Sequence, residues 1–265
     1  MSFLEKYLSA RQGKESLLCV GLDPAVKSQR RNNTIEGDML GFCENIVDNV
    51  ADSCLAIKVN SQYVLFNLTA GELSKLNKKI HSKGMISILD HKLSDIGASN
   101  ESALWWTSEC GFDALTASPY PGNISETIES AHQKDLGVFV LTLMSNPQAK
   151  WIQRHARVND VPVYRRVAEI SAQNKADGVV VGATEEVSER EVSEIRGEVG
   201  GDCVILFPGV GAQGGDLKKI ISSGGRNILV NVSRDVIYDA TPSAKARKYR
   251  EEIASLAKKL QGVVD

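Results

Sequence analysis

Three charged residues follow an apolar run in the segment MISILDHKLSDIG, residues 85–97. Asp90 and Lys92 are two positions apart, and Asp95 follows three positions later. In an extended backbone, residues two apart point to the same side, so Asp90 and Lys92 are expected to share a side while His91 points away. A carboxylate and an ammonium held together shift each other's pKa, as proton-transfer sites require. The segment therefore predicts a proton-transfer site at the end of a strand.

The charged segment ends one of eight short apolar runs, which alternate with helix-like segments. The runs are rich in Val, Ile and Leu and are bounded by Gly, Asp, Asn or Pro, which is typical of parallel strands buried on both faces. They cover residues 17–23, 54–60, 85–90, 113–118, 137–144, 177–184, 203–210 and 227–233. Eight strand–helix units in about 250 residues predict a (β/α)8 TIM barrel. A doubly wound open sheet is the alternative, but no GxGxxG motif follows the first run.

The segments between the runs show the periodicity of amphipathic helices, for example at residues 39–52, 73–84 and 164–175. Extra helices are expected at residues 2–11 and 242–261. Gly84, Gly111 and Gly137 stand where helix C-caps are expected. No linker or low-complexity tract divides the chain, so residues 1–265 are predicted to form a single domain. The longest connection, from Ser145 to about Pro162, is either a lid over the open face or an ordinary surface loop.

The composition excludes several functional classes. The net charge of the 265 residues is -2, so no broad basic surface is expected for a nucleic acid polymer or an anionic membrane. No run approaches the roughly 18 apolar residues that a membrane span needs. The five cysteines show neither a CxxC motif nor metal-ligand spacing, which indicates a reducing compartment. We therefore expect a soluble, cytoplasmic protein.

In a (β/α)8 barrel the active site lies at the carboxyl ends of the strands. The first predicted strand ends in Asp23, and the second carries Lys58 and Asn60, so charged side chains of three consecutive strands converge on one rim. A purely structural ion network is the alternative interpretation. Apolar packing is often as stable as a buried ion network, so stability alone is a poor reason to keep these charges.

A second pattern indicates a phosphate site. The segment PGVGAQGGD, residues 208–216, follows the seventh predicted strand and has four glycines, which let backbone amides approach an anion closely. Arg234 follows the eighth strand, and many barrels bind phosphate between these two loops. The alternative reading of the glycine-rich segment is a tight turn.

Taken together, these motifs resemble the orotidine 5'-phosphate decarboxylase family. The resemblance runs from GLDP at residues 21–24 to VSRDVIY at residues 232–238, and its most specific parts are the D-x-K-x-x-D element and PGVGAQGGD. It implies a barrel that removes CO2 from orotidine 5'-phosphate to give UMP in de novo pyrimidine biosynthesis, with no metal or organic cofactor. The segment NVSRD and the long segment 145–162 resemble a divergent, longer-chain branch of that family, and DIGAS stands where Ile-Pro-Asn-Thr is common.

The resemblance also implies roles for individual residues. Lys92 would donate a proton to C6 of the pyrimidine, Asp90 would lie beside the departing carboxylate, and Lys58 and Asp95 would complete the charged array. In that family the second Asp and the residue four positions later, here Ser99, reach the neighbouring site of a homodimer. The remaining implied contacts are Asp23 and Lys58 with the ribose, Ser145 with the pyrimidine edge, Gln213 and Arg234 with the phosphate, and Gly211, Gly214 and Gly215 in the loop that closes over it.

Three other functions remain open at this stage. A Mg2+-dependent 3-keto-gulonate 6-phosphate decarboxylase or hexulose phosphate synthase shares the D-x-K-x-x-D element, but it uses an acidic residue near the place where this chain has Lys58. A Schiff-base aldolase could use Lys58 or Lys92 as its nucleophile. A barrel that binds a phosphate ligand without catalysis is the third.

Overall fold

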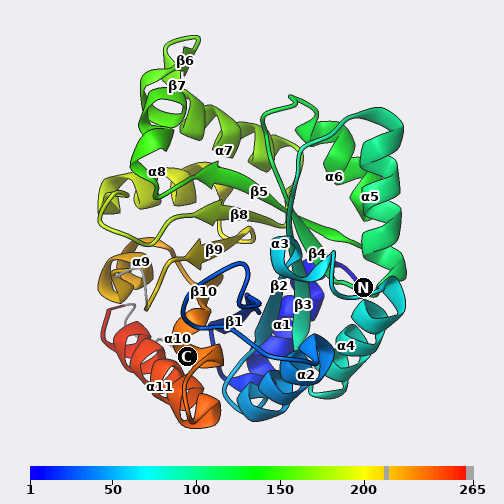
Figure 1. Cartoon of the computed structure of the whole chain (residues 1–265). Helices are drawn as coiled ribbons and strands as arrows, with labels where there is room; N and C mark the ends of the chain where they lie inside the picture. Colours follow the sequence, from blue (N-terminus) through cyan, green and yellow to red (C-terminus); the bar gives the residue numbers. More distant parts are fainter. Residues whose placement is uncertain (212–214, 261–265) are drawn as a thin grey trace.

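The computed structural model describes residues 1–211 and 215–260, and in them eight parallel strands close into a barrel surrounded by helices (Figure 1). The order around the barrel is β1-β10-β9-β8-β5-β4-β3-β2, and β1 pairs with β2 to close it. The barrel strands are β1 Leu18–Leu22, β2 Ala56–Asn60, β3 Ile86–Leu93, β4 Ala114–Ala117, β5 Gly137–Leu143, β8 Gly178–Val181, β9 Val204–Pro208 and β10 Ile228–Val232. Each predicted apolar run overlaps one of them, and the predicted TIM barrel is confirmed.

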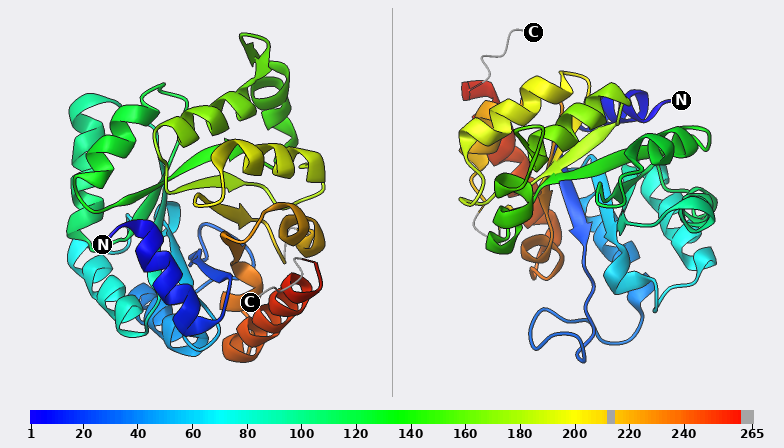
Figure 2. Two further views of the ribbon diagram at one scale, coloured as in Figure 1. Left: turned by 180° about the vertical axis from the view of Figure 1, so that it is seen from behind. Right: turned by 90° about the horizontal axis from the view of Figure 1, so that it is seen from above.

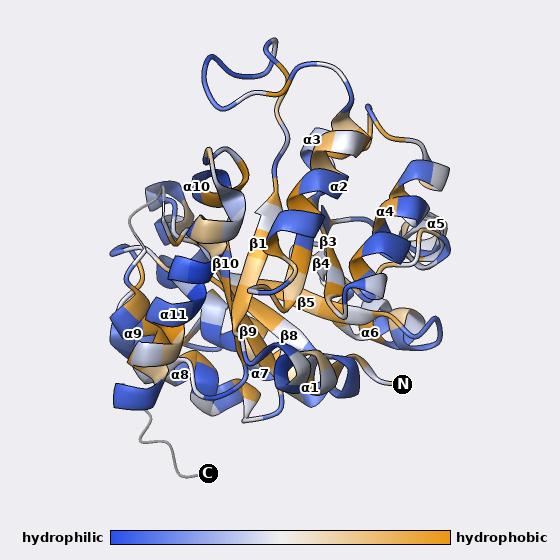
Figure 3. Cartoon of the chain, turned by 90° about the horizontal axis from the view of Figure 1, so that it is seen from below, coloured by the Kyte–Doolittle hydropathy of each residue, from blue (hydrophilic) through white to orange (hydrophobic). Residues whose placement is uncertain are grey.

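Helices follow the strands and surround the barrel, and one further helix, α1, precedes the first strand. Their bounds are α1 Phe3–Lys14, α2 Met39–Val50, α3 Ser61–Val64, α4 Ala70–Ser82, α5 Gly97–Glu109, α6 Ile124–His132, α7 Val163–Gln173, α8 Glu189–Val199, α9 Leu217–Ser223, α10 Arg234–Ile237 and α11 Pro242–Leu260. In Figure 3 the strands are coloured as hydrophobic, while the helices also carry hydrophilic residues. None of the described helices is both long and apolar enough to cross a membrane.

The core has two parts. One cluster fills the space between the strands and the helices. The other lies inside the barrel, and Phe3 and Tyr7 of α1 complete it from the end opposite the strand tips, where α1 crosses the barrel (Figure 2, left). The Tyr7 hydroxyl donates a hydrogen bond to the Ile228 carbonyl, at 3.0 Å. The helix expected at the amino-terminal end is therefore the barrel's floor.

One predicted helix cap is wrong. Gly84 and Gly111 follow α4 and α5 with positive φ, as expected of residues after a helix C-cap. Gly137, however, begins β5, and the residue with positive φ after α6 is Asp135. Gly137 has a packing role instead, because a Cβ atom there would lie 2.7 Å from the Phe3 ring.

Candidate active site

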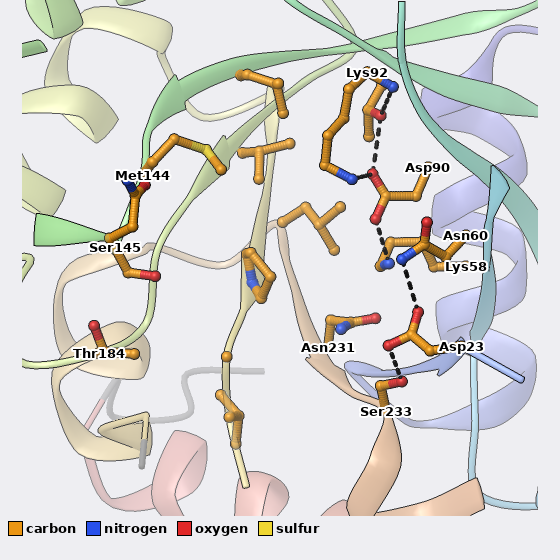
Figure 4. A pocket seen from close by; sticks show the side chains of 18 of the residues that line it. Asp23, Lys58, Asn60, Asp90, Lys92, Met144, Ser145, Thr184, Asn231 and Ser233 are labelled. Carbon is orange, nitrogen blue, oxygen red and sulfur yellow. Dashed lines mark hydrogen bonds and ion pairs between the residues drawn. The ribbon is translucent and has the colours of Figure 1, made fainter. Parts of the chain in front are cut away.

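A cavity of about 440 Å³ opens at the carboxyl ends of the barrel strands. Its lining includes Lys58 of β2, Asp90 and Lys92 of β3, and Asp23, which directly follows β1. These are the four charged side chains that the strand pattern placed on one rim. Figure 4 shows them in a row along one wall of the cavity.

Asp90 is held between two ammonium groups. Its Oδ2 lies 2.6 Å from the Nζ of Lys58, and its Oδ1 lies 2.7 Å from the Nζ of Lys92 (Figure 4). Lys58 is 5% exposed at its side chain and Asp90 is 11% exposed, whereas Lys92 is 39% exposed. Lys92 is therefore the member of the trio whose charge is open to a molecule in the cavity.

Asp90 and Lys58 keep their charges because each compensates for the burial of the other. Burial by itself would raise the pKa of Asp90, but Lys58 and Lys92 hold it well below its usual range. Burial by itself would lower the pKa of Lys58, but the carboxylates of Asp90 and Asp23 outweigh this and raise it. At neutral pH, Asp90 is a carboxylate and Lys58 is an ammonium ion.

A polar cluster continues along the same wall from the end of β1. Asp23 accepts hydrogen bonds from the Asn60 side-chain amide at 3.0 Å and from the Ser233 hydroxyl at 2.5 Å (Figure 4). Asn60 ends β2 and Ser233 follows β10, so Asp23 joins the tips of three adjacent strands. This wall offers a carboxylate, an amide and a hydroxyl, which suit the hydroxyl groups of a sugar.

His91 points away from the cavity, as the alternation predicted. It lines a separate, mostly apolar cavity with Leu89, Trp106 and other residues of the helical layer. Its Nδ1 lies 3.2 Å from the Ser61 hydroxyl, and burial together with the charge of Lys92 lowers the pKa of His91. His91 is therefore outside the reacting site.

The opposite wall is formed by Met144, Ser145 and Thr184 (Figure 4). Ser145 follows β5, and Thr184 lies in the connection after β8. Gly182 allows this arrangement, because a Cβ atom there would lie 2.6 Å from the Cβ of Ser145. The predicted Ser145 thus faces the charged row across the cavity.

The connections after β9 and β10 form another part of the cavity lining. Pro208, Gly209, Val210 and Arg234 line it there. Among the described residues, none accepts a hydrogen bond from the Arg234 guanidinium or forms an ion pair with it. Gly211 and Gly215 do not belong to the lining.

Two of the residues predicted for the phosphate, Gln213 and Gly214, lie outside the described residues. Gly211 has a φ of +83°, which favours glycine there. A Cβ atom at Gly211 would also lie 2.8 Å from the Tyr249 hydroxyl. The need for a glycine at position 211 is therefore explained by local backbone conformation and packing rather than by contact with the cavity.

Asp95 and Ser99 do not line the cavity formed by their own chain. Both are exposed, and the Asp95 carboxylate accepts only a local hydrogen bond from the backbone amide of Ile96, at 2.8 Å, among the described residues. The structure of one chain thus brings together Asp23, Lys58, Asp90 and Lys92 but leaves Asp95 and Ser99 outside.

The connection between Ser145 and Pro162 contains short elements of its own. These are η1 Pro147–Ala149, η2 Trp151–His155, and a hairpin of β6 Arg157–Val158 and β7 Val161–Pro162. The hairpin projects beyond α7 in Figure 1. Arg154 anchors the segment to α8 through an ion pair with Glu191 at 2.6 Å. Only Ser145 and Asn146 of this segment line the cavity.

Several residues of the cavity were not assigned a role from the sequence. Thr116 of β4 and Asn231 of β10 are buried polar residues that line it. Each lies between apolar neighbours inside a predicted strand, Thr116 in DALTAS and Asn231 in NILVNVS, and a polar residue at such a position is the sequence signal that could have identified them. Within residues 1–211 and 215–260, no group of three or more His, Cys, Asp or Glu side chains is placed to hold a metal ion.

Comparison with known proteins places this barrel in a family. Residues 16–249 match the model of the orotidine 5'-phosphate decarboxylase / HUMPS family. A protein of Cupriavidus necator with the name orotidine 5'-phosphate decarboxylase is 36% identical over 250 residues, which cover 90% of each chain. One from Ralstonia pickettii is 36% identical over 255 residues, which cover 92% of each chain. The chain belongs to the orotidine 5'-phosphate decarboxylase / HUMPS family.

A solved structure agrees with the sequence comparison. The OMP decarboxylase of Leishmania donovani superposes with a TM-score of 0.80 at 29% identity, covering 97% of this chain and 99% of the other. The match extends over the whole barrel and its surrounding helices. The resemblance inferred from the D-x-K-x-x-D and glycine-rich motifs is therefore confirmed at the level of the family.

Proposed function

We propose that this chain converts orotidine 5'-phosphate to UMP and CO2, with Lys92 as the proton donor. The overall reaction, a carboxy-lyase step of pyrimidine biosynthesis, follows from membership of the family and from the curated relatives. The observation that carries the residue roles is the Lys58–Asp90–Lys92 arrangement, in which an ionised carboxylate and a partly exposed ammonium meet at one cavity wall.

The chemistry requires such a wall. When the bond from C6 to the carboxylate breaks, CO2 leaves and its bonding electron pair remains on C6. An ammonium fixed beside C6 stabilises that charge more effectively than water does, because its position needs no reorganisation during the reaction. Lys92 would then transfer a proton from Nζ to C6, giving UMP, and would regain a proton from solvent.

Asp90 and Lys58 support this step in different ways. Asp90 would lie beside the substrate carboxylate and hold the Lys92 ammonium at Oδ1. Lys58 balances the second oxygen of Asp90 and lies within the field of Asp23. Asp23 and Lys58 would also contact the ribose hydroxyls, from the same wall that carries Asn60 and Ser233.

The other parts of the nucleotide would be bound away from the charged row. Ser145 faces that row across the cavity and would contact the pyrimidine edge. Arg234 lines the cavity after β10 and would pair with the phosphate, a geometry that guanidinium groups favour. Gln213, Gly211, Gly214 and Gly215 remain proposed members of the phosphate loop. Binding energy from the phosphate can then be used to order the charged wall.

A homodimer with shared sites accounts for Asp95 and Ser99, which are exposed in the single chain. Large apolar side chains are also exposed on segments that follow β2 and β3, with Phe66 at 96%, Ile96 at 62% and Trp106 at 51%. Burial of such side chains against a second copy would be favourable. We include the homodimer and the cytoplasmic location in the proposal.

The test is the fall in absorbance as orotidine 5'-phosphate becomes UMP, measured for the wild type and for Lys92→Ala. We expect kcat to fall by at least about 10⁴-fold in the variant, because both the electrostatic stabilisation and the proton are lost. Lys75→Ala, which removes a lysine from an exposed ion pair with Glu44, serves as the matched control and should keep wild-type activity.

Three further outcomes would redirect the assignment. Activity that disappears with EDTA and returns with Mg2+ would favour a metal-dependent member of the family. Trapping of a carbonyl substrate on Lys58 or Lys92 by borohydride would favour a Schiff-base enzyme. A Lys92→Ala variant that loses only affinity would favour a binding protein.

A further inference from the structure

We propose that Thr116 of β4 is a positioning residue that fixes Lys92 and Asp90 relative to each other. This inference rests on the proposed decarboxylation, for which Lys92 and Asp90 are the reacting-site charges. It concerns a residue that is 1% exposed and lies on the neighbouring strand.

The first observation is the pairing of β3 with β4. Leu89 pairs with Leu115 and Leu93 pairs with Ala117, so the register shifts between them. As a result, the three residues 90–92 lie opposite the single residue Thr116. This is a bulge in β3, and bulges commonly redirect side chains next to active sites.

The second observation is the backbone conformation of Lys92. Its φ is +56°, in the left-handed region that residues with a side chain rarely adopt. Such a conformation persists only where surrounding contacts enforce it. The Lys92 backbone N–H donates a hydrogen bond to the Thr116 hydroxyl oxygen at 2.9 Å, which is a contact of that kind.

The third observation is the direction of the Thr116 hydroxyl. It donates to Oδ1 of Asp90 at 3.1 Å, and the same oxygen accepts the Lys92 ammonium at 2.7 Å. These three contacts form a closed ring of hydrogen bonds: the Lys92 backbone N–H to the Thr116 hydroxyl, that hydroxyl to Asp90, and the Lys92 Nζ to Asp90. Thr116 thus holds both the backbone of Lys92 and the carboxylate that its side chain binds.

The ring has a clear kinetic consequence. Without the hydroxyl, the backbone amide of Lys92 loses its acceptor and Asp90 loses one donor, so the bulge is free to relax. Displacement of a reacting group by about 1 Å can cost on the order of 10²-fold in rate. Substrate binding through Arg234 and Asp23 does not depend on this ring, so kcat should change much more than KM.

The decisive variant is Thr116→Val, which replaces the hydroxyl by a methyl group of similar size. We expect kcat for orotidine 5'-phosphate to fall by about 10- to 100-fold, with KM and UMP affinity within about threefold of wild type. Thr116→Ser keeps the hydroxyl and should retain kcat to within about threefold. The matched control is Thr142→Val, because the Thr142 hydroxyl is also buried but bonds only to the Val140 carbonyl among the described residues.

The comparison stays decisive if Thr116→Val does not fold. Thr116→Ala and Thr116→Ser both lose the methyl group and differ by one hydroxyl, so the ratio of their kcat values isolates the ring. A ratio near one, or equal losses in Thr116→Val and Thr142→Val, would overturn the positioning role. An inactive wild type would instead contradict the proposed function, so the two failures are distinguishable.

Discussion

Lys58 and Lys92 bind opposite oxygens of one carboxylate, that of Asp90, at 2.6 Å and 2.7 Å. Lys58 approaches from β2, and Lys92 approaches from two residues further along β3 itself. The shared carboxylate allows two ammonium groups to lie near each other at the mouth of the barrel. It also means that the structural and the chemical contributions of Asp90 can be separated by experiment.

We expect Asp90→Asn to lower both stability and activity. The buried Lys58 ammonium loses its main counter-charge, which costs about 3–5 kcal/mol when one partner of a buried pair is removed. The value of kcat should fall by at least about 10³-fold, because the Lys92 ammonium is no longer held in place. Urea unfolding and the absorbance assay measure the two effects.

The control for Asp90→Asn is the double variant Lys58→Met with Asp90→Leu. Apolar replacement of a whole buried pair is often neutral for stability, so this variant should regain much of the lost free energy of unfolding. It should remain inactive. Activity that returned together with stability would show that the trio only supports the fold.

Arg234→Ala should weaken binding of the phosphate while leaving the fold intact, since no described residue depends on its guanidinium. We expect KM for orotidine 5'-phosphate to rise by about 10- to 100-fold, as for loss of a charge-assisted hydrogen bond. The nucleoside orotidine, which has no phosphate, is the matched substrate. Its kcat/KM should be the same for both enzymes, and an equal loss on both substrates would contradict the assignment.

Mixing two inactive variants tests whether the sites are shared between subunits. Lys92→Ala and Asp95→Ala should each be inactive alone. If Asp95 serves the neighbouring site, a heterodimer has one site with both changes and one intact site. After unfolding and refolding at equal amounts, about a quarter of the wild-type activity should appear. No recovery in a mixture shown by mass measurement to contain heterodimers would place Asp95 in its own chain's site.

Asp113 at the barrel floor should make stability depend on pH. Its carboxylate lies 3.0 Å from Lys6 of α1 and 2.9 Å from His81 of α4, and it accepts the Ser87 amide of β3 at 2.8 Å. Burial by itself would raise the pKa of Asp113, but His81, the Ser87 amide and Lys6 together hold it below the usual value.

A lowered pKa in the folded state sets the sign of this effect. The stabilisation is complete above the unfolded-state pKa of about 3.9 and is lost as the pH falls through the folded value. Asp113→Asn should therefore cost about 1–3 kcal/mol at pH 7, and the difference from wild type should shrink below about pH 4. Urea unfolding across pH measures it, with the exposed Asp202→Asn as the control. A difference that stays constant with pH would contradict the ion-pair explanation.

The sequence was sufficient to predict the barrel because its strands are buried on both faces. Such strands read as short apolar runs, and the glycines and polar residues between them marked the ends to within a few residues. The predicted end of β3 came too early, since the strand continues through Asp90 and Lys92 to Leu93. Because Asp90 and Lys92 are charged, the apolar pattern stops before the strand does.

The alternation of side chains along a strand correctly predicted that Asp90 and Lys92 lie on the same side, facing the cavity. It did not predict the backbone conformation that places them there. The two residues meet because of a bulge and a left-handed backbone at Lys92, and neither follows from residue spacing. Thr116 was missed for the same reason, since its partners are set by the register between β3 and β4. The roles of Asp95 and Ser99 depend on a second copy of the chain, which the pattern of one chain does not reveal.

The Tyr7 hydroxyl and the Ile228 carbonyl are separated by 221 positions along the chain. The contact between Tyr7 and β10 can therefore form only after nearly all of the barrel has been translated. Until β10 is made, β1 also lacks one of its two neighbours. Contacts between such distant positions form late and slowly. The residues translated before β1 can make their contacts with β10 only after that last strand has been translated. Until then, partially synthesised chains expose apolar residues of the barrel interior, which chaperones recognise.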